Sequence, residues 1–277
     1  MNIAPAPLIS LSNGVEMPRL GLGTWPMNDA EAAETVALAL DMGYRLIDTA
    51  ENYENERGVG EGIRRAGVAR EEVFVTTKFN RKWHSDDGAR RACEASLERL
   101  GLDYIDLFLV HWPNPDQGRY VEAFEGLVKL QQAGLVRAIG TSNFKPTHLQ
   151  RLFDAGLCPQ VNQIHLDPWH ARADHIEVHK ARGIVTESWS PLGRANAMLG
   201  DPAILDVARR HGRSPAQVIL RWHTQLGYVP IPKSSNPQRL AENLDVFGFE
   251  LGAEELAAIS ALDRPDPEML DSDVFGH

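Results

Sequence analysis

Polar and titratable side chains follow several short apolar runs in this sequence, and four of them together suit proton transfer. Asp48 ends the run YRLID and Tyr53 lies in the loop after it, while Lys78 ends VFVTTK and His111 ends IDLFLVH. A phenol is a poor acid near neutral pH, with an ordinary pKa of about 10. A lysine ammonium beside it favours the phenolate and lowers this pKa. Asp48 would keep the lysine charged, and His111 would donate a hydrogen bond to a carbonyl oxygen, so the set suits a proton donor to a developing alkoxide.

These side chains can meet only if the apolar runs are neighbouring strands. From Leu20 onward, short apolar runs alternate with amphipathic stretches eight times. The expected strands are 20–23, 45–48, 73–77, 105–110, 135–140, 161–165, 184–188 and 228–231. The expected helices are 29–42, 55–66, 86–100, 118–133, 146–155 and 173–182, then two opened by Asp201-Pro202 and Ser214-Pro215, one opened by Asn236-Pro237, and a last one at 253–262.

Eight strand–helix units with short connections predict an α/β fold, a closed (β/α)8 or TIM barrel, formed as a single domain by residues 1–277. An N-terminal β-hairpin around Asn13-Gly14 precedes the barrel, and extra C-terminal helices follow it. A doubly wound open sheet is the alternative, but the first turn reads GLGTWP and lacks the GxGxxG pattern. Because strand ends converge at the mouth of a barrel, the four side chains are expected to be neighbours. The proline- and aspartate-rich tail from Arg264 is expected on the surface.

Composition and charge narrow the classes of partner. Hydrophobic residues make up 43% and charged residues 24%, which is an ordinary globular balance. A net charge of −10 argues against a nucleic-acid or anionic-membrane surface but allows a local phosphate pocket. Cys93, placed on an apolar helix stripe, and Cys158 have no metal-binding spacing. With no apolar stretch long enough to span a membrane, we expect a monomeric cytoplasmic protein.

Four histidines raise the question of a metal site. His165, His170, His175 and His179 lie close together in sequence, but HIEVH is not the zinc-binding pattern HExxH. Metal-dependent barrel hydrolases usually carry HxH after the first strand, where this chain has GLGTW. The sequence therefore predicts no metal, and a metal-dependent hydrolase is the less favoured alternative.

Motifs at seven strand ends resemble the aldo-keto reductase family from about Val15 to Leu262. GYRLIDTAENYENERGVG, VTTK, LVHWP, IGTSNF, VNQI, SPLG and IPKSSNPQRLAENL occur in the family's order. TESWSPLG and the short loop after His111 resemble bacterial members of the 2,5-diketo-D-gluconate reductase type. The resemblance implies NADPH-dependent reduction of aldehydes or ketones, including small dicarbonyls, aromatic aldehydes and keto-sugars. Tyr53 would be the acid, with Asp48, Lys78 and His111 as its catalytic partners.

The resemblance also implies a cofactor site for NADPH or NADP+. Ser142, Asn143 and Gln163 resemble the residues that bind the carboxamide, and Trp189 takes the place of the aromatic side chain that stacks on the nicotinamide. Further cofactor-binding residues would be Gly23, Thr24, Trp25, Ser190, Leu192, Gly193, Ile231, Lys233, Ser234, Ser235, Arg239, Glu242 and Asn243. Among these, Lys233, Ser234 and Arg239 would bind the 2′-phosphate at a helix N-terminus, which is an anion site.

Two departures and one alternative accompany the resemblance. The sixth strand reads NQIHLDP where the family often has NQIEL-H-P, and Asn236 stands where relatives often have a basic residue. Trp25, Trp83 and Trp112 follow expected strands, so they are predicted to wall the substrate site beside His111, whereas Trp222 lies within a helix. A barrel that binds NADPH for regulation or scaffolding without turnover is the alternative function, and the intact catalytic set argues against it.

Overall fold

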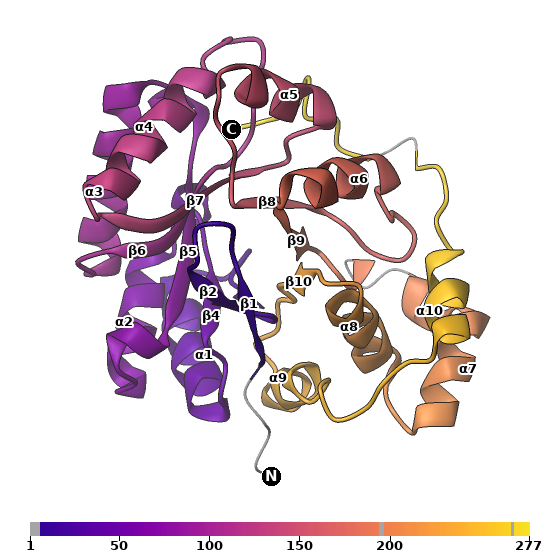
Figure 1. Cartoon of the computed structure of the whole chain (residues 1–277). Helices are drawn as coiled ribbons and strands as arrows, with labels where there is room; N and C mark the ends of the chain where they lie inside the picture. The colour runs from indigo at the N-terminus through magenta and orange to yellow at the C-terminus, as the bar shows by residue number, and fades with distance from the viewer. Residues whose placement is uncertain (1–5, 194–196, 267–268) are drawn as a thin grey trace.

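The computed structural model describes residues 6–193, 197–266 and 269–277, and its centre is a barrel of eight parallel strands (Figure 1). Each strand pairs with its sequence neighbours, in the order β3 (Leu22–Gly23), β4 (Leu46–Asp48), β5 (Phe74–Phe79), β6 (Ile105–Val110), β7 (Val136–Ser142), β8 (Val161–His165), β9 (Val185–Trp189) and β10 (Val229–Pro230). The Gly21 N–H donates to the Pro230 carbonyl at 3.1 Å and the Gly23 N–H to the Pro232 carbonyl at 3.2 Å. These bonds join the first strand to the last, so the predicted (β/α)8 barrel is confirmed.

The closing pair of strands is shorter than the sequence predicts, and proline and glycine explain why. Pro230 and Pro232 have no N–H to donate, so the last strand can only accept bonds from the first. A Cβ atom on Gly23 would lie 2.9 Å from the Ile231 carbonyl oxygen. Glycine is therefore needed for the two strands to approach this closely, at a point that also forms part of the mouth.

Ten helices of the described chain cover the barrel or extend beyond it. They are α1 (Asp29–Met42), α2 (Glu56–Ala66), α3 (Asp86–Leu100), α4 (Tyr120–Gln132), α5 (Pro146–Asp154), α6 (Ala173–Arg182), α7 (Pro202–His211), α8 (Pro215–Gln225), α9 (Pro237–Leu244) and α10 (Ala253–Ser260). The Ser214 hydroxyl accepts from the Gln217 N–H and the Gln217 amide oxygen accepts from the Ser214 N–H, which confirms the expected capping box of α8. α4 begins two residues later than expected, because Gly118 is left-handed with φ +65°.

The side-chain alternation of the strands separates an apolar layer from a polar one inside the barrel. Leu46 packs inside the barrel, Ile47 faces the helices, and Asp48 returns to the inside at the mouth. Phe74 and Lys78 of β5 are similarly two alternations apart on one face. The same period that buries leucine and phenylalanine low in the barrel therefore aims the titratable groups at its mouth.

A hairpin closes the opposite end of the barrel. β1 (Leu8–Ser10) pairs antiparallel with β2 (Glu16–Pro18), as the Asn-Gly turn predicts. Leu11 and Met17 pack with Leu46 and other inward-facing strand residues, and the Asn13 side-chain amide donates to the Arg137 carbonyl at 3.0 Å. The hairpin lies in front of the barrel in Figure 1 and leaves the mouth free.

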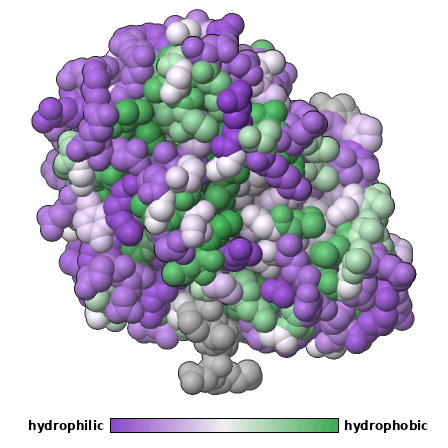
Figure 2. Space-filling view, viewed as in Figure 1, coloured by the Kyte–Doolittle hydropathy of each residue, from purple (hydrophilic) through white to green (hydrophobic). Residues whose placement is uncertain are grey.

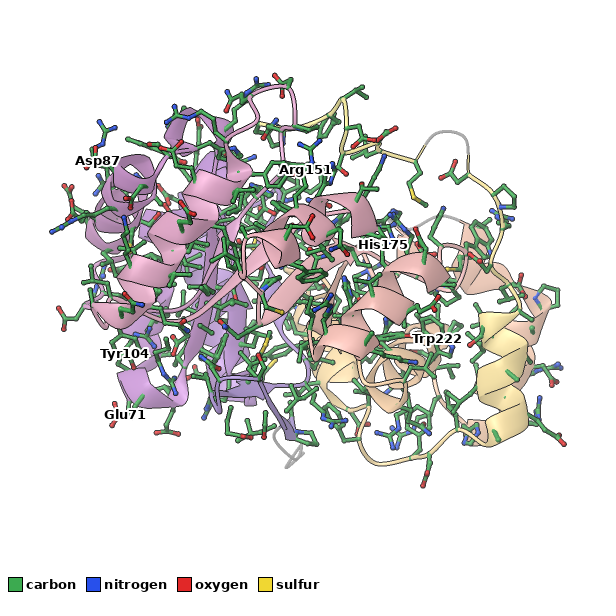
Figure 3. The ribbon with its side chains drawn as sticks, turned by 45° about the horizontal axis from the view of Figure 1, so that its top comes forward. Glu71, Asp87, Tyr104, Arg151, His175 and Trp222 are labelled. Atoms are coloured by element: carbon green, nitrogen blue, oxygen red, sulfur yellow. The ribbon has the colours of Figure 1, made fainter. Side chains whose placement is uncertain are left out.

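The outer surface is mainly hydrophilic. Hydrophilic side chains dominate the rim of the face shown in Figure 2, and charged residues such as Glu71 and Asp87 lie at the periphery in Figure 3. Trp222, also labelled there, is buried in α8 and donates its indole N–H to Ser260 of α10 at 2.9 Å. No helix in the described ranges is both long enough and apolar enough to cross a membrane.

Candidate active site

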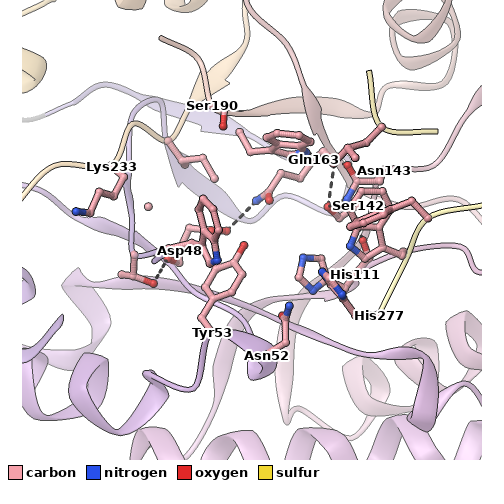
Figure 4. Close-up of a pocket in the computed structure, with 18 residues that line it drawn as sticks. Asp48, Asn52, Tyr53, His111, Ser142, Asn143, Gln163, Ser190, Lys233 and His277 are labelled. Atoms are coloured by element: carbon pink, nitrogen blue, oxygen red, sulfur yellow. Dashed lines mark hydrogen bonds between the residues drawn. The ribbon is translucent and has the colours of Figure 1, made fainter. Parts of the chain in front are cut away.

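A pocket of about 690 Å³ opens at the C-terminal ends of the strands. Its lining combines strand ends, the loop after β4 and the C-terminal tail, which we define as residues 269–277. The residues that line it are Gly23, Thr24, Trp25, Asp48, Asn52, Tyr53, His111, Trp112, Ser142, Asn143, Gln163, Trp189, Ser190, Ile231, Lys233, Leu270, Phe275 and His277 (Figure 4). Thirteen of these eighteen residues lie within β3–β10 or at most three residues after one of these strands, as expected for the mouth of a barrel.

The four residues predicted to transfer a proton lie together. The Lys78 ammonium donates to Asp48 Oδ1 at 2.8 Å and to the Thr49 carbonyl at 2.9 Å. The Tyr53 hydroxyl lies 3.5 Å from the same nitrogen. The Tyr53 and His111 rings meet edge to face, with centroids 5.9 Å apart. Lys78 is fully buried and lies behind Tyr53; it is the one of the four that does not line the pocket, whereas Asp48, Tyr53 and His111 do.

Burial and charge act in opposite directions on the buried pair. Burial lowers the pKa of Lys78, but the charge and hydrogen bond of Asp48, together with Tyr53 and Glu187, outweigh burial, and the net pKa is raised. Burial raises the pKa of Asp48, and the Lys78 charge opposes that rise. Because each group is the principal partner of the other, the lysine keeps its proton at neutral pH.

The expected direction of the Tyr53 pKa needs a correction. Burial of the phenol raises its pKa more than the neighbouring Lys78 charge lowers it, so the net direction is upward. Sequence spacing alone reveals the cation but not how completely water is excluded. Tyr53 is consequently a neutral phenol at pH 7 and keeps the proton that an acid must give.

His111 is also neutral. Burial, the Lys78 charge and nearby His277 lower its pKa well below the ordinary value. Its Nδ1 atom is buried and has no hydrogen-bond partner among the described residues. A neutral imidazole carries one N–H donor, which suits a hydrogen bond to a carbonyl oxygen in the pocket.

On the opposite wall, a chain of hydrogen bonds orients the groups expected to hold a nicotinamide. The Trp189 indole N–H donates to Asn143 Oδ1 at 2.8 Å, and the Asn143 amide donates to Ser142 Oγ at 3.0 Å (Figure 4). Trp189 also stacks on His165, with ring centroids 4.4 Å apart and an interplanar angle of 13°. Trp189 therefore presents a fixed aromatic face to a pocket that also holds amide donors and acceptors, and this combination fits a planar carboxamide ring.

The anionic end of the expected cofactor site is only partly inside the pocket. Lys233 lines the pocket and lies 3.4 Å from Glu31. Arg239, at the N-terminus of α9, is exposed, and no carboxylate of the described chain lies within ion-pair distance of it. The Asn236 side chain caps this helix by accepting from the Arg239 N–H. Outside the pocket lining are Leu192, Gly193, Ser234, Ser235, Arg239, Glu242 and Asn243. Lysine, arginine and a helix N-terminus fit a phosphate group.

Two of the three tryptophans predicted to wall the substrate site lie in the pocket. Trp112 is buried, whereas Trp25 is 53% exposed at the rim. Trp83 does not line the pocket, which corrects its expected position. Its indole N–H donates instead to both carboxylate oxygens of Glu51, at 2.9 and 3.0 Å, and it supports the loop from behind.

The C-terminal tail was expected on the surface, but part of it forms a wall of the pocket. Phe275 meets Trp112 edge to face, with centroids 4.8 Å apart, and the His277 backbone oxygen accepts from the Arg81 N–H at 2.6 Å. Figure 1 shows the tail near α5 at the top of the view. Sequence reasoning missed Asn52, Leu270, Phe275 and His277 as pocket residues. The only signal was a phenylalanine among acidic residues.

The altered motif of the sixth strand forms a buried polar cluster behind Trp189. His165 Nε2 lies 3.2 Å from Asp167 Oδ2, and His170 Nδ1 lies 2.9 Å from Asp167 Oδ1. The candidate ligand atoms of these three residues lie within 4.8 Å of one another. The His165 and His170 rings are tilted by 33° to each other, and His165 in turn stacks on Trp189, so the cluster supports Trp189 by packing.

A (β/α)8 barrel with Asp48, Tyr53, Lys78 and His111 at its mouth has the architecture of a carbonyl-reducing oxidoreductase. The model of the aldo/keto reductase family matches residues 19–264, and the chain belongs to this family.

Individual relatives are similar along nearly the whole chain. The chain is 46% identical to methylglyoxal reductase DkgA of Yersinia pestis, covering 96% of this chain and 98% of the relative. It is also 46% identical to 2,5-diketo-D-gluconic acid reductase B of a Corynebacterium strain, covering 93% and 94%. The crystal structure of a Gox0644 mutant in complex with NADPH superposes with a TM-score of 0.92, at 45% identity and 98% coverage of both chains.

Proposed function

We propose that this oxidoreductase reduces aldehyde and ketone carbonyls to alcohols with NADPH, and that Tyr53 donates the proton. The observation that carries the proposal is the position of the Lys78 ammonium, 2.8 Å from Asp48 and 3.5 Å from the Tyr53 hydroxyl. A carbonyl oxygen that accepts a hydride becomes an alkoxide, and a cation behind the phenol stabilises the phenolate left after proton transfer.

The residues of the pocket have different roles in the proposed reaction. When bound, NADPH supplies the hydride. Trp189 and Asn143 offer a flat face and amide groups for the carboxamide ring, while Tyr53 and His111 meet the carbonyl oxygen as donors. Lys78 and Asp48 keep a charge pair buried behind the phenol. These roles support hydride delivery from the cofactor and proton donation from Tyr53 to the same carbonyl group.

The choice of NADPH is supported by the relatives and by the local charges. A structural neighbour at 45% identity was crystallised with NADPH, and Lys233 and Arg239 supply positive charge beside the N-terminus of α9. For the substrate, Trp25, Trp112 and Phe275 provide apolar walls near Tyr53. We infer that small dicarbonyls and aromatic aldehydes are accepted, in line with the reductase names of two relatives.

Tyr53→Phe tests the proton donor. General acid catalysis contributes about 10²–10⁴-fold, so stopped-flow NADPH oxidation with methylglyoxal should slow by that factor. The ring is retained, so a fluorescence titration should show nearly unchanged NADPH binding. Tyr104→Phe is the control, because Tyr104 immediately precedes β6 at the opposite end of the barrel.

The same measurement separates the proposal from its alternative. A wild-type protein that binds NADPH yet oxidises none of it in a single turnover, with any of a panel of aldehydes, dicarbonyls and keto-sugars, would be a binding barrel for regulation or scaffolding. A Tyr53→Phe protein with an unchanged rate would assign proton donation to another group, with His111 the first candidate.

A further inference from the structure

A second buried acid lies beside the catalytic group, and the chemistry described so far does not use it. Glu187 of β9 is paired in register with Gln163 of β8, and its side chain is completely buried. The Gln163 amide nitrogen donates to Glu187 Oε2 at 2.7 Å and to Asp48 Oδ2 at 2.8 Å. One amide therefore links two carboxyl groups contributed by strands on different sides of the barrel.

These two bonds determine which way the Gln163 amide faces. A primary amide nitrogen has two N–H donors, and the two carboxyl groups use both of them. The reversed orientation would place the amide oxygen against Asp48, which is paired with Lys78 and has no proton to give. The Gln163 oxygen is therefore the atom left to face outward, and Gln163 lines the pocket.

Glu187 accepts the hydrogen bond from Gln163 without carrying a charge at neutral pH. Burial and then the negative charge of Asp48 raise the pKa of Glu187 to about 8. The charged groups that act on it are Asp48 of β4 and Lys78 of β5, and the Tyr53 phenol responds to it in turn. Glu187 Oε1 has no partner among the described residues, so no donor stabilises a negative charge on that oxygen. The carbonyl oxygen of a protonated acid still accepts a hydrogen bond, so Gln163 keeps its orientation.

We propose that Glu187 is a positioning residue that fixes the Gln163 amide with its oxygen toward the nicotinamide, and that it thereby selects a cofactor carrying a carboxamide N–H. The inference rests on the proposed NADPH site and deepens it. Glu187 lines no part of the pocket in the described chain, so it acts through Gln163.

The experiment compares two cofactors and two substitutions. The cofactors are NADPH and reduced 3-acetylpyridine adenine dinucleotide phosphate, whose acetyl group lacks the N–H donors of the carboxamide. Their dissociation constants are measured by tryptophan fluorescence without any carbonyl substrate. Glu187→Gln keeps an oxygen acceptor for Gln163, whereas Glu187→Met keeps the length and removes the acceptor.

Wild type should bind NADPH about tenfold more tightly than the analogue, the ratio for one neutral hydrogen bond. Glu187→Gln should retain the ratio. In Glu187→Met only the bond to Asp48 still holds the amide, so turning it to donate to the acetyl oxygen costs one hydrogen bond less and the ratio should fall to about twofold or less. A Glu187→Met protein that keeps the tenfold preference would overturn the proposal, and so would a Glu187→Gln protein that loses it.

A second substitution covers the case in which Glu187→Met does not fold. Gln163→Leu removes the amide itself and should abolish the preference, so its persistence would also overturn the proposal. Failure of the cofactor site as a whole gives a different result, because wild type would then bind neither nucleotide.

Discussion

At the scale of single residues, the barrel mouth contains more buried acid than base. Asp48 and Glu187 both lie near a single lysine, Lys78, and all three side chains are buried. Two ionised carboxylates beside one ammonium would leave a net negative charge in a region without water, which is unfavourable. The protein avoids this by keeping Glu187 protonated at neutral pH, since its pKa is raised to about 8.

The raised pKa predicts how stability depends on pH. The folded protein binds a proton at Glu187 that the unfolded chain releases near pH 4.5, so stability is lost as the pH rises from about 4.5 to about 8. Glu187→Gln has no proton to release. The free energy of unfolding of Glu187→Gln should therefore rise relative to that of wild type across this window, by on the order of 5 kcal/mol at most. Urea unfolding at several pH values measures the difference, and parallel pH profiles would contradict the assignment.

Arg239 offers a test of cofactor choice. Lys233 shares its charge with Glu31, at 3.4 Å, whereas Arg239 has no carboxylate partner within the described ranges. Arg239→Ala should weaken NADPH binding by about 1.5–3 kcal/mol, the range for hydrogen bonds to charged groups, and leave NADH binding nearly unchanged. Titration with both cofactors checks this, and Arg209→Ala, an exposed arginine of α7, is the control. Equal losses for NADPH and NADH would place the 2′-phosphate elsewhere.

The identity of the catalytic residues could be predicted from the sequence, but their burial and pKa values could not. Asp48, Tyr53, Lys78 and His111 could be predicted because the mouth of a barrel collects whatever ends its strands. The direction of the Tyr53 pKa could not, because it depends on how completely the phenol is buried. Glu187 lies within the strand and not at its end, so the sequence reasoning, which followed strand ends, did not single it out.

At the scale of elements, α2 is held between its neighbours by glycines. A Cβ atom on Gly60 would lie 1.9 Å from the Leu100 carbonyl oxygen at the end of α3, and one on Gly58 would lie 2.1 Å from the Asp29 carbonyl oxygen of α1. Backbone therefore packs directly on backbone on two sides of this helix. Because α2 begins directly after the loop that carries Tyr53, its packing also sets the position of that loop.

Gly60→Ala should be destabilising despite the better helix propensity of alanine. The added methyl group cannot be accommodated without moving α2 away from α3, and overpacking of this kind costs about 1–3 kcal/mol. Thermal unfolding measures the loss. Gly200→Ala is the matched control, because nothing lies within 4 Å of its Cβ position, and it should be neutral. Equal stability of the two variants would show that α2 can shift freely.

The element boundaries could be predicted where caps and glycines mark them. α6 (Ala173–Arg182) has the predicted range, although its pattern is weak. Two of the errors fall at the barrel closure, where proline shortens β10, and at α4, where a left-handed glycine delays the helix start. Both depend on local backbone geometry that apolar periodicity does not record.

At the scale of the whole molecule, the pocket is built from two parts of the chain with different attachments. The strand ends belong to the barrel itself, whereas the C-terminal tail is held from outside. Lys145, which precedes α5, forms ion pairs with Asp271 and with Asp273, the latter at 2.7 Å. His148 Nε2 lies 2.8 Å from Asp273 Oδ1. The Lys145 charge before α5 and the His148 ring on α5 thus hold the segment that carries Phe275.

Lys145→Met should loosen the tail without touching the cofactor. Exposed ion pairs contribute about 0.2–1 kcal/mol, so KM for a carbonyl substrate should rise by about two- to fivefold, and NADPH binding should be unchanged. Added salt should raise KM of wild type in the same direction and have less effect on the variant. Lys129→Met removes an ion pair with Asp86 far from the tail and is the control. A KM that responds to both substitutions alike would exclude a specific role for the tail.

The attachment of the tail from outside the barrel affects how the protein can evolve and how it can be engineered. Its residues supply Leu270, Phe275 and His277 to the pocket, yet no strand of the barrel passes through them. Changes there leave the hydrogen-bond ladder of the barrel and the buried charge pair intact. Substitutions in this one short segment can consequently change the range of carbonyl compounds that the enzyme accepts. A library randomised only at residues 269–277 would sample new specificities while the barrel stays unchanged.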